Sequence, residues 1–141
     1  QFRYIFVPLD GSALSNTVLP LVEAFALACK SKVTLLRVEP FIVSGVPSPA
    51  IQPAVWNPEK TKATLEPQRE RLAAKGIEVE VRAAYGFEAQ EILATTEKIP
   101  VDLVAMSTHG RSGVSHWWFG SVAESVLRHC PLPLLILRSV D

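Results

Sequence analysis

Hydrophobic residues recur along this chain in short continuous runs, and the runs alternate with longer segments in which apolar positions follow a helical period. A short apolar run is typical of a strand that is buried on both faces of a parallel sheet. The pattern predicts strands at Tyr4 to Leu9, Lys32 to Val38, Ile77 to Ala83, Val101 to Met106 and Leu134 to Leu137. It predicts helices at Ala13 to Lys30, Pro58 to Lys75, Phe87 to Lys98 and Gly120 to His129.

This alternation of strands and helices predicts an α/β protein, because parallel strands need crossover connections. We expect one domain over residues 1–141, built on a five-stranded parallel sheet with helices on both faces. Ligands on such sheets bind outside the carboxyl ends of the strands, where the strand order reverses. If the first strand is central and the fourth lies beside it, that point falls between Asp10 and Ser107.

Prolines and glycines refine the predicted helices. Pro20 removes a helical hydrogen bond unless it lies in the first turns of its helix, and Pro67 marks either a helix start or a kink. Gly76 is expected to end its helix in a left-handed conformation. The segment from Pro40 to Pro58 holds five prolines, which predicts a long loop that acts as a lid or a contact surface or is disordered.

The composition limits the classes of partner. Of the 141 residues, 48% are hydrophobic, and fourteen basic residues balance fourteen acidic ones. A neutral chain has no overall attraction for nucleic acid or for an anionic membrane. No apolar run reaches the length of a membrane span, and no signal peptide is visible. We therefore expect a cytoplasmic protein, while the first residue, Gln1, leaves open whether the chain was trimmed or belongs to a longer product.

Cys29 and Cys130 stand far apart without metal-ligand spacing. We expect both to behave as small buried apolar residues in a reducing compartment.

Many common catalytic motifs are absent from the sequence. There is no Walker loop, no dinucleotide-binding glycine motif after the first strand, no nucleophile elbow and no zinc-protease helix motif. A kinase, a GTPase or a Rossmann dehydrogenase is therefore not expected.

The loop after the fourth predicted strand is the strongest candidate for chemistry. A strand, a glycine-bearing loop and a helix N-terminus together bind phosphate, because free N–H groups and the positive end of the helix dipole converge there. Glycine also lets the backbone approach an anion closely. An ordinary flexible loop explains the same spacing, so the residues alone leave both interpretations open. The glycines and hydroxyls of this loop are Ser107, Thr108, Gly110, Ser112, Gly113, Gly120 and Ser121.

Three segments carry a resemblance to a known family. Gly110 is followed by nine residues and then by Gly120-Ser121, the chain opens with VPLDGS at residues 7–12, and it closes with GSVAESVLRHCPLPLLILR. These segments resemble the universal stress protein family over the whole chain, and its ATP-binding members carry G-x2-G-x9-G-[S/T] after strand four. Ser107 stands at the first glycine of that pattern, which is a departure. The resemblance implies the strand order 3-2-1-4-5 of the adenine nucleotide α-hydrolase-like fold.

The resemblance also implies roles for individual residues. Gly110, Gly120 and Ser121 would hold phosphates through backbone N–H groups, and Val38 would offer its backbone to the adenine edge. Asp10 would lie near the ribose or a bound Mg²⁺ or Mn²⁺ ion, although it could instead cap the first helix. The whole implied nucleotide-binding set is Pro8, Leu9, Asp10, Val38, Met106, Ser107, His109, Gly110, Arg111, Gly113, Gly120, Ser121 and Val122.

Several residues of the loop have alternative roles. Met106 and Ser107 would lie against the ribose and the α-phosphate. Arg111 could reach a γ-phosphate or remain solvated, and His109 is expected as a turn residue because no nucleophile or orienting carboxylate is near it in sequence. The bulky residues 116–118 could stack on adenine, but packing on a neighbouring subunit or on the proline-rich loop fits them better.

We therefore expect an adenine-nucleotide-binding domain, for ATP or for AMP or ADP, that acts as a homodimer in stress response or signalling. Little or no turnover is expected, because nothing in the sequence assembles a general base with an attacking water. The same fold without nucleotide binding, as an interaction module, and a slow ATP hydrolase are the alternatives. The dimer would cover the edge of the last strand by antiparallel pairing with a second copy. The residues of that edge are Leu134, Leu135, Ile136 and Leu137.

Overall fold

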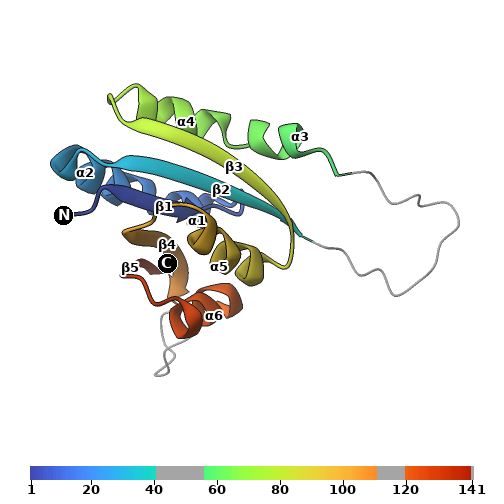
Figure 1. Cartoon of the computed structure of the whole chain (residues 1–141). Coiled ribbons are helices and arrows are strands. Elements are labelled where there is room, and N and C mark those ends of the chain that lie inside the picture. The colour runs from blue at the N-terminus through green and yellow to red at the C-terminus, as the bar shows by residue number, and fades with distance from the viewer. Residues whose placement is uncertain (41–55, 111–119, 141) are drawn as a thin grey trace, which may run out of the picture.

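Five parallel strands form one sheet, which confirms the predicted fold class (Figure 1). The computed structural model describes residues 1–40, 56–110 and 120–140. The strands are β1 (Tyr4–Pro8), β2 (Lys32–Pro40), β3 (Glu78–Gly86), β4 (Leu103–Gly110) and β5 (Leu134–Val140). Their order across the sheet is β3-β2-β1-β4-β5, as predicted. The chain therefore runs outward from the central β1 in one direction through β2 and in the other through β4.

Helices cover both faces of this sheet (Figure 1). The helices are α1 (Ala13–Asn16), α2 (Leu19–Cys29), α3 (Pro58–Ala63), α4 (Glu66–Ala73), α5 (Glu88–Lys98) and α6 (Ser121–His129). The central strand shows how the core divides between the two faces, because successive side chains of a strand point to opposite sides. Ile5 and Val7 pack in one cluster with Val22 of α2, whereas Phe6 packs in the other with Ile92 of α5.

Two predicted helices are each broken in two, and a proline accounts for both breaks. The predicted helix from Ala13 to Lys30 divides into α1 and α2, and Pro20 is the second residue of α2. The predicted helix from Pro58 to Lys75 divides into α3 and α4, and Pro67 is the second residue of α4. A proline is tolerated there because the first turn of a helix has no use for its missing N–H. Gly76 has the left-handed conformation predicted for it, with φ +84, but the C-cap of α4 is Ala74.

Four strands extend further at their carboxyl ends than the apolar runs predicted, most of all β4, whereas β1 ends at Pro8, one residue before the predicted Leu9. The apolar run was expected to end at Met106, but β4 continues to Gly110 and stays paired with β5 as far as Gly110 and Val140. Ser107 and Thr108 therefore lie in a strand rather than in a loop. Hydrophobic side chains mark only the part of a strand that lies between helices, and backbone pairing continues beyond that part.

The cysteines and the helix lengths bear on two further expectations. Cys29 and Cys130 are free thiols, but each is partly exposed and not buried as predicted. The reason is their position, because Cys29 is the last residue of α2 and Cys130 caps the end of α6. Among the helices of the described ranges, none is long and apolar enough to cross a membrane.

Candidate functional site

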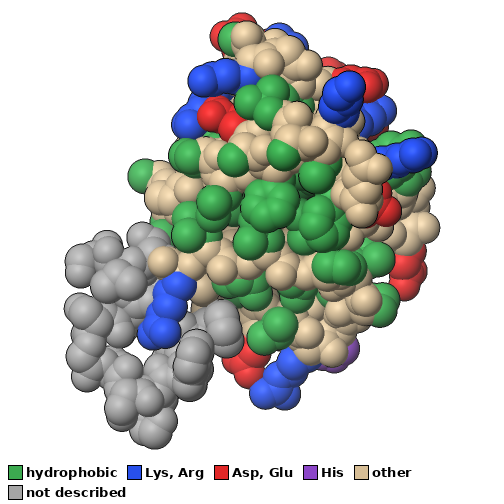
Figure 2. Space-filling model, turned by 90° about the vertical axis from the view of Figure 1, so that its left-hand side faces the viewer, with side chains coloured by type: hydrophobic (Ala, Val, Ile, Leu, Met, Phe, Trp, Pro, Cys, Tyr) green, Lys and Arg blue, Asp and Glu red, His purple; other side chains and the backbone are tan. Residues whose placement is uncertain are grey.

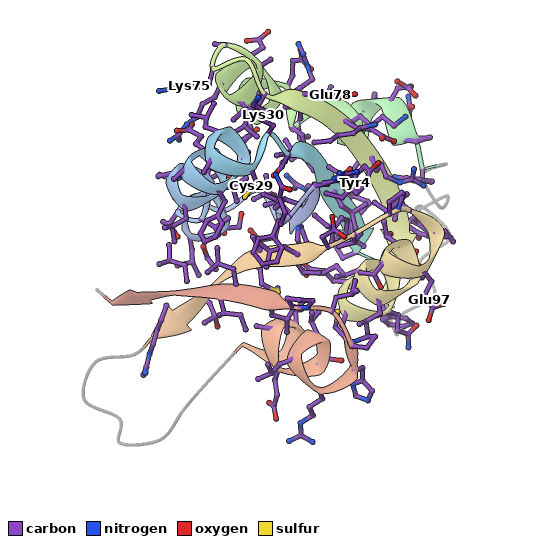
Figure 3. All side chains as sticks on the ribbon, turned by 60° about the vertical axis from the view of Figure 1, so that its left-hand side comes forward. Tyr4, Cys29, Lys30, Lys75, Glu78 and Glu97 are labelled. Atoms are coloured by element: carbon purple, nitrogen blue, oxygen red, sulfur yellow. The ribbon has the colours of Figure 1, made fainter. Side chains whose placement is uncertain are left out.

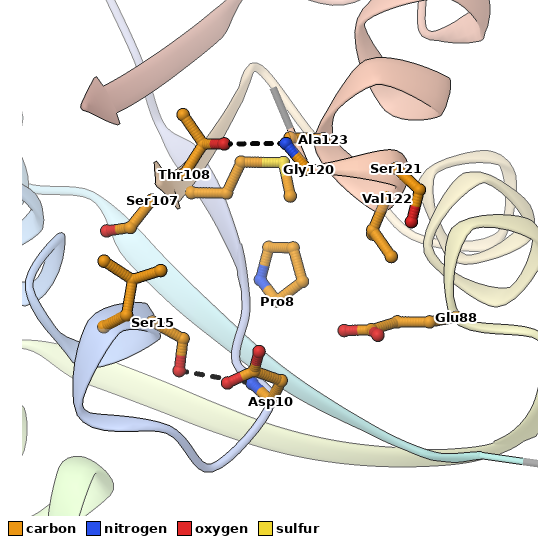
Figure 4. Close-up of a pocket in the computed structure, with 12 residues that line it drawn as sticks. Pro8, Asp10, Ser15, Glu88, Ser107, Thr108, Gly120, Ser121, Val122 and Ala123 are labelled. Carbon is orange, nitrogen blue, oxygen red and sulfur yellow. Dashed lines mark hydrogen bonds between the residues drawn. The ribbon is translucent and has the colours of Figure 1, made fainter. Parts of the chain in front are cut away.

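A pocket of about 180 Å³ opens at the carboxyl ends of β1 and β4, where the strand order reverses (Figure 4). This is the point between Asp10 and Ser107 at which a parallel α/β sheet is expected to bind its ligand. The first turns of α5 and α6 and the turn after β1 complete its wall. The lining residues are Pro8, Asp10, Leu14, Ser15, Glu88, Met106, Ser107, Thr108, Gly120, Ser121, Val122 and Ala123.

One end of the pocket is formed by the N-terminus of α6. Gly120 is the N-cap, and its backbone N–H donates to Oγ1 of Thr108 at 3.1 Å. Thr108 is only 3% exposed, so β4 and α6 are joined by a bond in the interior of the site. The first backbone N–H groups of a helix have no partner within the helix. The amide of Gly120, expected to hold a phosphate, is thus already bonded to the protein, and those of Ser121 to Ala123 follow it along the pocket wall.

The opposite end of the pocket carries Asp10, which lies just beyond β1. Its Oδ1 accepts the backbone N–H of Ser12 at 2.8 Å. Ser12 is the N-cap of α1, since its hydroxyl accepts the N–H of Ser15 at 3.1 Å. Asp10 therefore shapes the turn before α1 but does not cap the helix itself. Partial burial raises the pKa of Asp10, but hydrogen bonds from Ser12 and Ser15 and the charge of Arg37 outweigh it and lower that pKa below its ordinary value.

A second carboxylate, Glu88, enters the pocket from the first residue of α5 and points toward the same space as Asp10 (Figure 4). Burial of its side chain raises the pKa of Glu88, and the nearby negative charge of Asp10 raises it further, while Arg37 acts in the opposite direction. Glu88 was not predicted from the sequence as a site residue. Only Phe87 separates it from the end of β3, so the rule that ligands bind beyond the carboxyl ends of parallel strands would have drawn attention to it.

Arg37 supplies positive charge to both carboxylates from β2. Its guanidinium packs against the backbone of Gly11, where a Cβ atom would lie 2.2 Å from Nη1 of Arg37. Gly11 also has φ +86, which side chains disfavour. Glycine at this position therefore lets the turn after β1 bring Asp10 and Arg37 together.

Ser107 lines the pocket at the position where the family motif has its first glycine. Its Oγ lies 2.8 Å from Oγ1 of Thr17, which donates its own proton to the carbonyl oxygen of Leu14 at 2.6 Å. Thr17 has only one hydroxyl proton, so Ser107 must be the donor between the two hydroxyls. In Figure 4 the Ser107 hydroxyl points away from Pro8 and the centre of the pocket. The serine therefore replaces glycine without placing its hydroxyl in the central space.

The other expected site residues have different positions. Leu9 and Val38 are core residues, 2% and 7% exposed, and neither lines the pocket. Gly110 ends β4. Arg111, Gly113 and residues 116–118 lie outside the described residues, as does the proline-rich segment over residues 41–55, and the side chain of His109 is likewise not described. The expected residues that line the pocket are Pro8, Asp10, Met106, Ser107, Gly120, Ser121 and Val122.

Several further pocket residues, which carry no motif signal of their own, were not predicted from the sequence. Thr108 belonged to the list of loop hydroxyls but was given no role, and Ser15 is a common helix residue. The remaining missed residues are Leu14, Glu88 and Ala123.

Metal ligands are sparse here, because the described part of the chain contains no group of three His, Cys, Asp or Glu side chains that could hold an ion. A divalent cation would need oxygens from a bound phosphate, which is how Mg²⁺ is usually held beside nucleotides.

The fold and the pocket define a parallel α/β protein with a pocket at the switch point of its sheet. Residues 1–138 match the model of the universal stress protein family, so the chain belongs to that family. It is similar to universal stress protein YxiE of Bacillus subtilis, with 28% identity over 150 residues that cover 98% of this chain and 100% of the relative. The match over nearly the whole of both chains shows that the family assignment does not rest on one motif.

Solved structures agree with the fold. Universal stress protein UspA from Lactobacillus plantarum superposes with a TM-score of 0.77 at 19% identity, covering 98% of this chain and 99% of that one. A universal stress protein in complex with cAMP superposes with a TM-score of 0.69 at 20% identity, covering 97% of each chain. At these identities the likeness shows a shared fold, and that second protein holds its nucleotide on such a fold.

Proposed function

We propose that this chain binds an adenine nucleotide, ATP or ADP or AMP, in the pocket between Asp10 and Ser107. The observation that carries the proposal is the first turn of α6, which opens onto a pocket at the switch point of the sheet. Free amides and the positive end of a helix dipole favour a phosphate there. Membership of the universal stress protein family and the cAMP complex of a similar fold support the same ligand class.

The charge of the pocket gives the nucleotide one orientation. Phosphate oxygens would face the amides of Ser121 to Ala123, and the hydroxyl of Ser121 would add a donor. Asp10 lies at the other end, where its carboxylate repels phosphate and accepts from hydroxyl or amine groups. A nucleotide would therefore lie with its nucleoside toward β1 and its phosphates toward α6. Mg²⁺ or Mn²⁺ would bind with the phosphates, and we expect binding with little or no turnover.

Isothermal titration with ATP, ADP and AMP, each with and without Mg²⁺, tests this proposal. Heat of binding is expected for the unmodified chain and none for Gly120→Val. A Cβ atom at Gly120 meets no atom of the described residues within 4 Å, so valine there should block the ligand and leave the fold intact. Ser125→Val on the same helix is the matched control, since Ser125 does not line the pocket. Absence of heat for the unmodified chain at millimolar nucleotide would contradict the proposal.

An interaction module without nucleotide is the second candidate. Two groups of the motif favour it, because the amide of Gly120 and the hydroxyl of Ser107 both bond to the protein itself. In that case the unmodified chain and Gly120→Val would behave alike in the nucleotide titration. The titration above separates the two candidates directly.

We also infer that two copies pair through the edge of β5. Among the described strands, β5 pairs with β4 alone, so one of its edges is open (Figure 3). Hydrophobic side chains gather across the middle of one face of the molecule (Figure 2), and Leu135 and Leu137 of β5 are only partly buried where they pack against the core. An open apolar edge tends to aggregate unless it is covered, and a two-fold pair of strands covers it.

A further inference from the structure

Glu88 is the one carboxylate of the pocket that has no hydrogen-bond partner among the described residues. Asp10 accepts from Ser12, Thr108 accepts from Gly120, and Ser107 donates to Thr17. The Glu88 carboxylate instead points into the open space of the pocket, as Figure 4 shows. The protein thus leaves a hydrogen-bond acceptor unused at the place where a ligand would lie.

The surroundings of Glu88 make this acceptor strong. Its side chain is half-buried, so water solvates the carboxylate less well than it would on the surface, and Asp10 adds a second negative charge nearby. A carboxylate that has lost hydration gains more from a donor than an exposed one does. Arg37 opposes the repulsion from β2, but no bond is present between its guanidinium and Glu88 within the described residues.

We propose that Glu88 is a specificity-determining residue that accepts a hydrogen bond from an N–H or O–H donor on the nucleoside part of the ligand. The inference rests on the proposed nucleotide function and extends it, because it names the ligand groups that the pocket selects. A nucleotide with a donor facing Glu88 binds well, whereas one with an acceptor or no polar group there leaves a desolvated carboxylate unpaired.

Two ligand groups carry that chemistry, and matched nucleotides separate them. The exocyclic amine of adenine is replaced by a carbonyl oxygen in inosine 5′-monophosphate, while 2′-deoxy-AMP and 3′-deoxy-AMP each lack one ribose hydroxyl. All four ligands carry the same phosphate. The repulsion between Glu88 and the phosphate is therefore the same for all four. It cancels in the ratio of each analogue's dissociation constant to that of AMP.

The experiment is isothermal titration of AMP and the three analogues into the unmodified chain, Glu88→Gln and Glu88→Ala. Glu97→Gln is the matched control, since Glu97 is an exposed residue of the same helix outside the pocket (Figure 3). Glutamine preserves the size of the side chain, and alanine removes the acceptor. Thermal unfolding of each variant at pH 7 verifies that the fold is intact.

We expect the unmodified chain and Glu97→Gln to bind AMP about tenfold more tightly than the analogue that lacks the recognised donor, as for a hydrogen bond to a charged group. In Glu88→Ala this ratio should fall to about one, and in Glu88→Gln to an intermediate value. Ratios that stay unchanged in Glu88→Ala, or that equal one already in the unmodified chain, overturn the inference and leave the proposed function standing. Absence of binding by every nucleotide overturns both.

Discussion

The hydroxyl of Thr108 accepts the backbone N–H of Gly120 at 3.1 Å, across twelve positions of the chain. This bond joins the carboxyl end of β4 to the first turn of α6, and Thr108 is almost fully buried where it forms. The side chain of Thr108 therefore holds the N-terminus of α6 against the sheet, although Thr108 is not part of the phosphate-binding motif. An N-terminus held in this way presents the amides of Ser121 to Ala123 to the pocket at a fixed angle.

Thr108→Val tests this relationship, because valine has nearly the same shape but cannot accept the Gly120 N–H. We expect a loss of about 1 kcal/mol in the free energy of unfolding, measured by urea denaturation. Nucleotide affinity should fall as well, since α6 is no longer held in place. Thr108→Ser keeps the acceptor and should recover most of both. Equal behaviour of the valine and serine variants would show that the bond has no role.

Gly11→Ala is expected to alter the charges of the pocket as well as the stability of the fold. A methyl group there meets the guanidinium of Arg37, which can move aside because it ends a flexible side chain. Arg37 lowers the pKa of both Asp10 and Glu88, so its displacement should raise both pKa values. Carboxyl titration followed by NMR measures these shifts.

Gly76→Ala is the control for Gly11→Ala. Both glycines have positive φ, +86 and +84, so each alanine should cost roughly 1–2 kcal/mol through backbone strain. No atom in the described part of the chain lies within 4 Å of a Cβ atom at Gly76, and Gly76 does not line the pocket. The pKa of Glu88 should therefore stay constant in Gly76→Ala. A shift of equal size in both variants would mean that Arg37 is not the cause.

The sheet could be predicted from the sequence because its physical signal is strong. A run such as residues 4–9 is apolar at nearly every position, and only a strand covered on both faces by helices requires that. The sequence marked Pro20 and Pro67 as positions where a helix either starts or kinks, but it could not decide between the two, since a proline is acceptable at both. The extension of β4 through Ser107 and Thr108 depends on pairing with β5, and no property of those two residues indicates it.

The candidate site was less predictable than the fold. Asp10 and Ser107 were placed at the correct edge because the carboxyl ends of parallel strands meet there. The hydrogen bonds of Thr17 and Thr108 join residues about ninety and twelve positions apart, respectively, and a local pattern carries no signal for such pairs. Glu88 was missed for a related reason, because its importance arises from burial beside Asp10 and not from a motif.

Glu88→Gln is expected to change stability with a definite dependence on pH. The pKa of Glu88 is raised above its ordinary value in the folded chain, by burial first and by Asp10 second, with Arg37 in opposition. The folded state then binds more protons than the unfolded state, so this group lowers stability as pH rises through its raised pKa. Glutamine carries no charge and avoids that loss.

The variant should therefore unfold at a higher temperature than the unmodified chain at pH 7 to 8. The difference should vanish near pH 4, below the ordinary pKa of a glutamate, where both side chains are neutral. Asp10 has a lowered pKa, so in both folded proteins it titrates below this range and is not the source of the difference. A difference that is constant over this range would show that the charge of Glu88 is not its source.

The proposed dimer makes a prediction for single backbone amides of β5. The N–H of Val104 donates to the carbonyl oxygen of Pro133 at 3.0 Å, and Val104 stands opposite Leu134 in the parallel register. In a parallel ladder the groups that face the neighbour alternate, so the N–H of Leu135 faces β4 and that of Ile136 faces the open edge. Hydrogen exchange followed by NMR should find the Leu135 amide protected at every protein concentration. The Ile136 amide should be protected only at concentrations where the chain is dimeric by light scattering, because a strand of a second copy is its expected acceptor. Fast exchange of Ile136 in a dimeric sample would place the interface elsewhere.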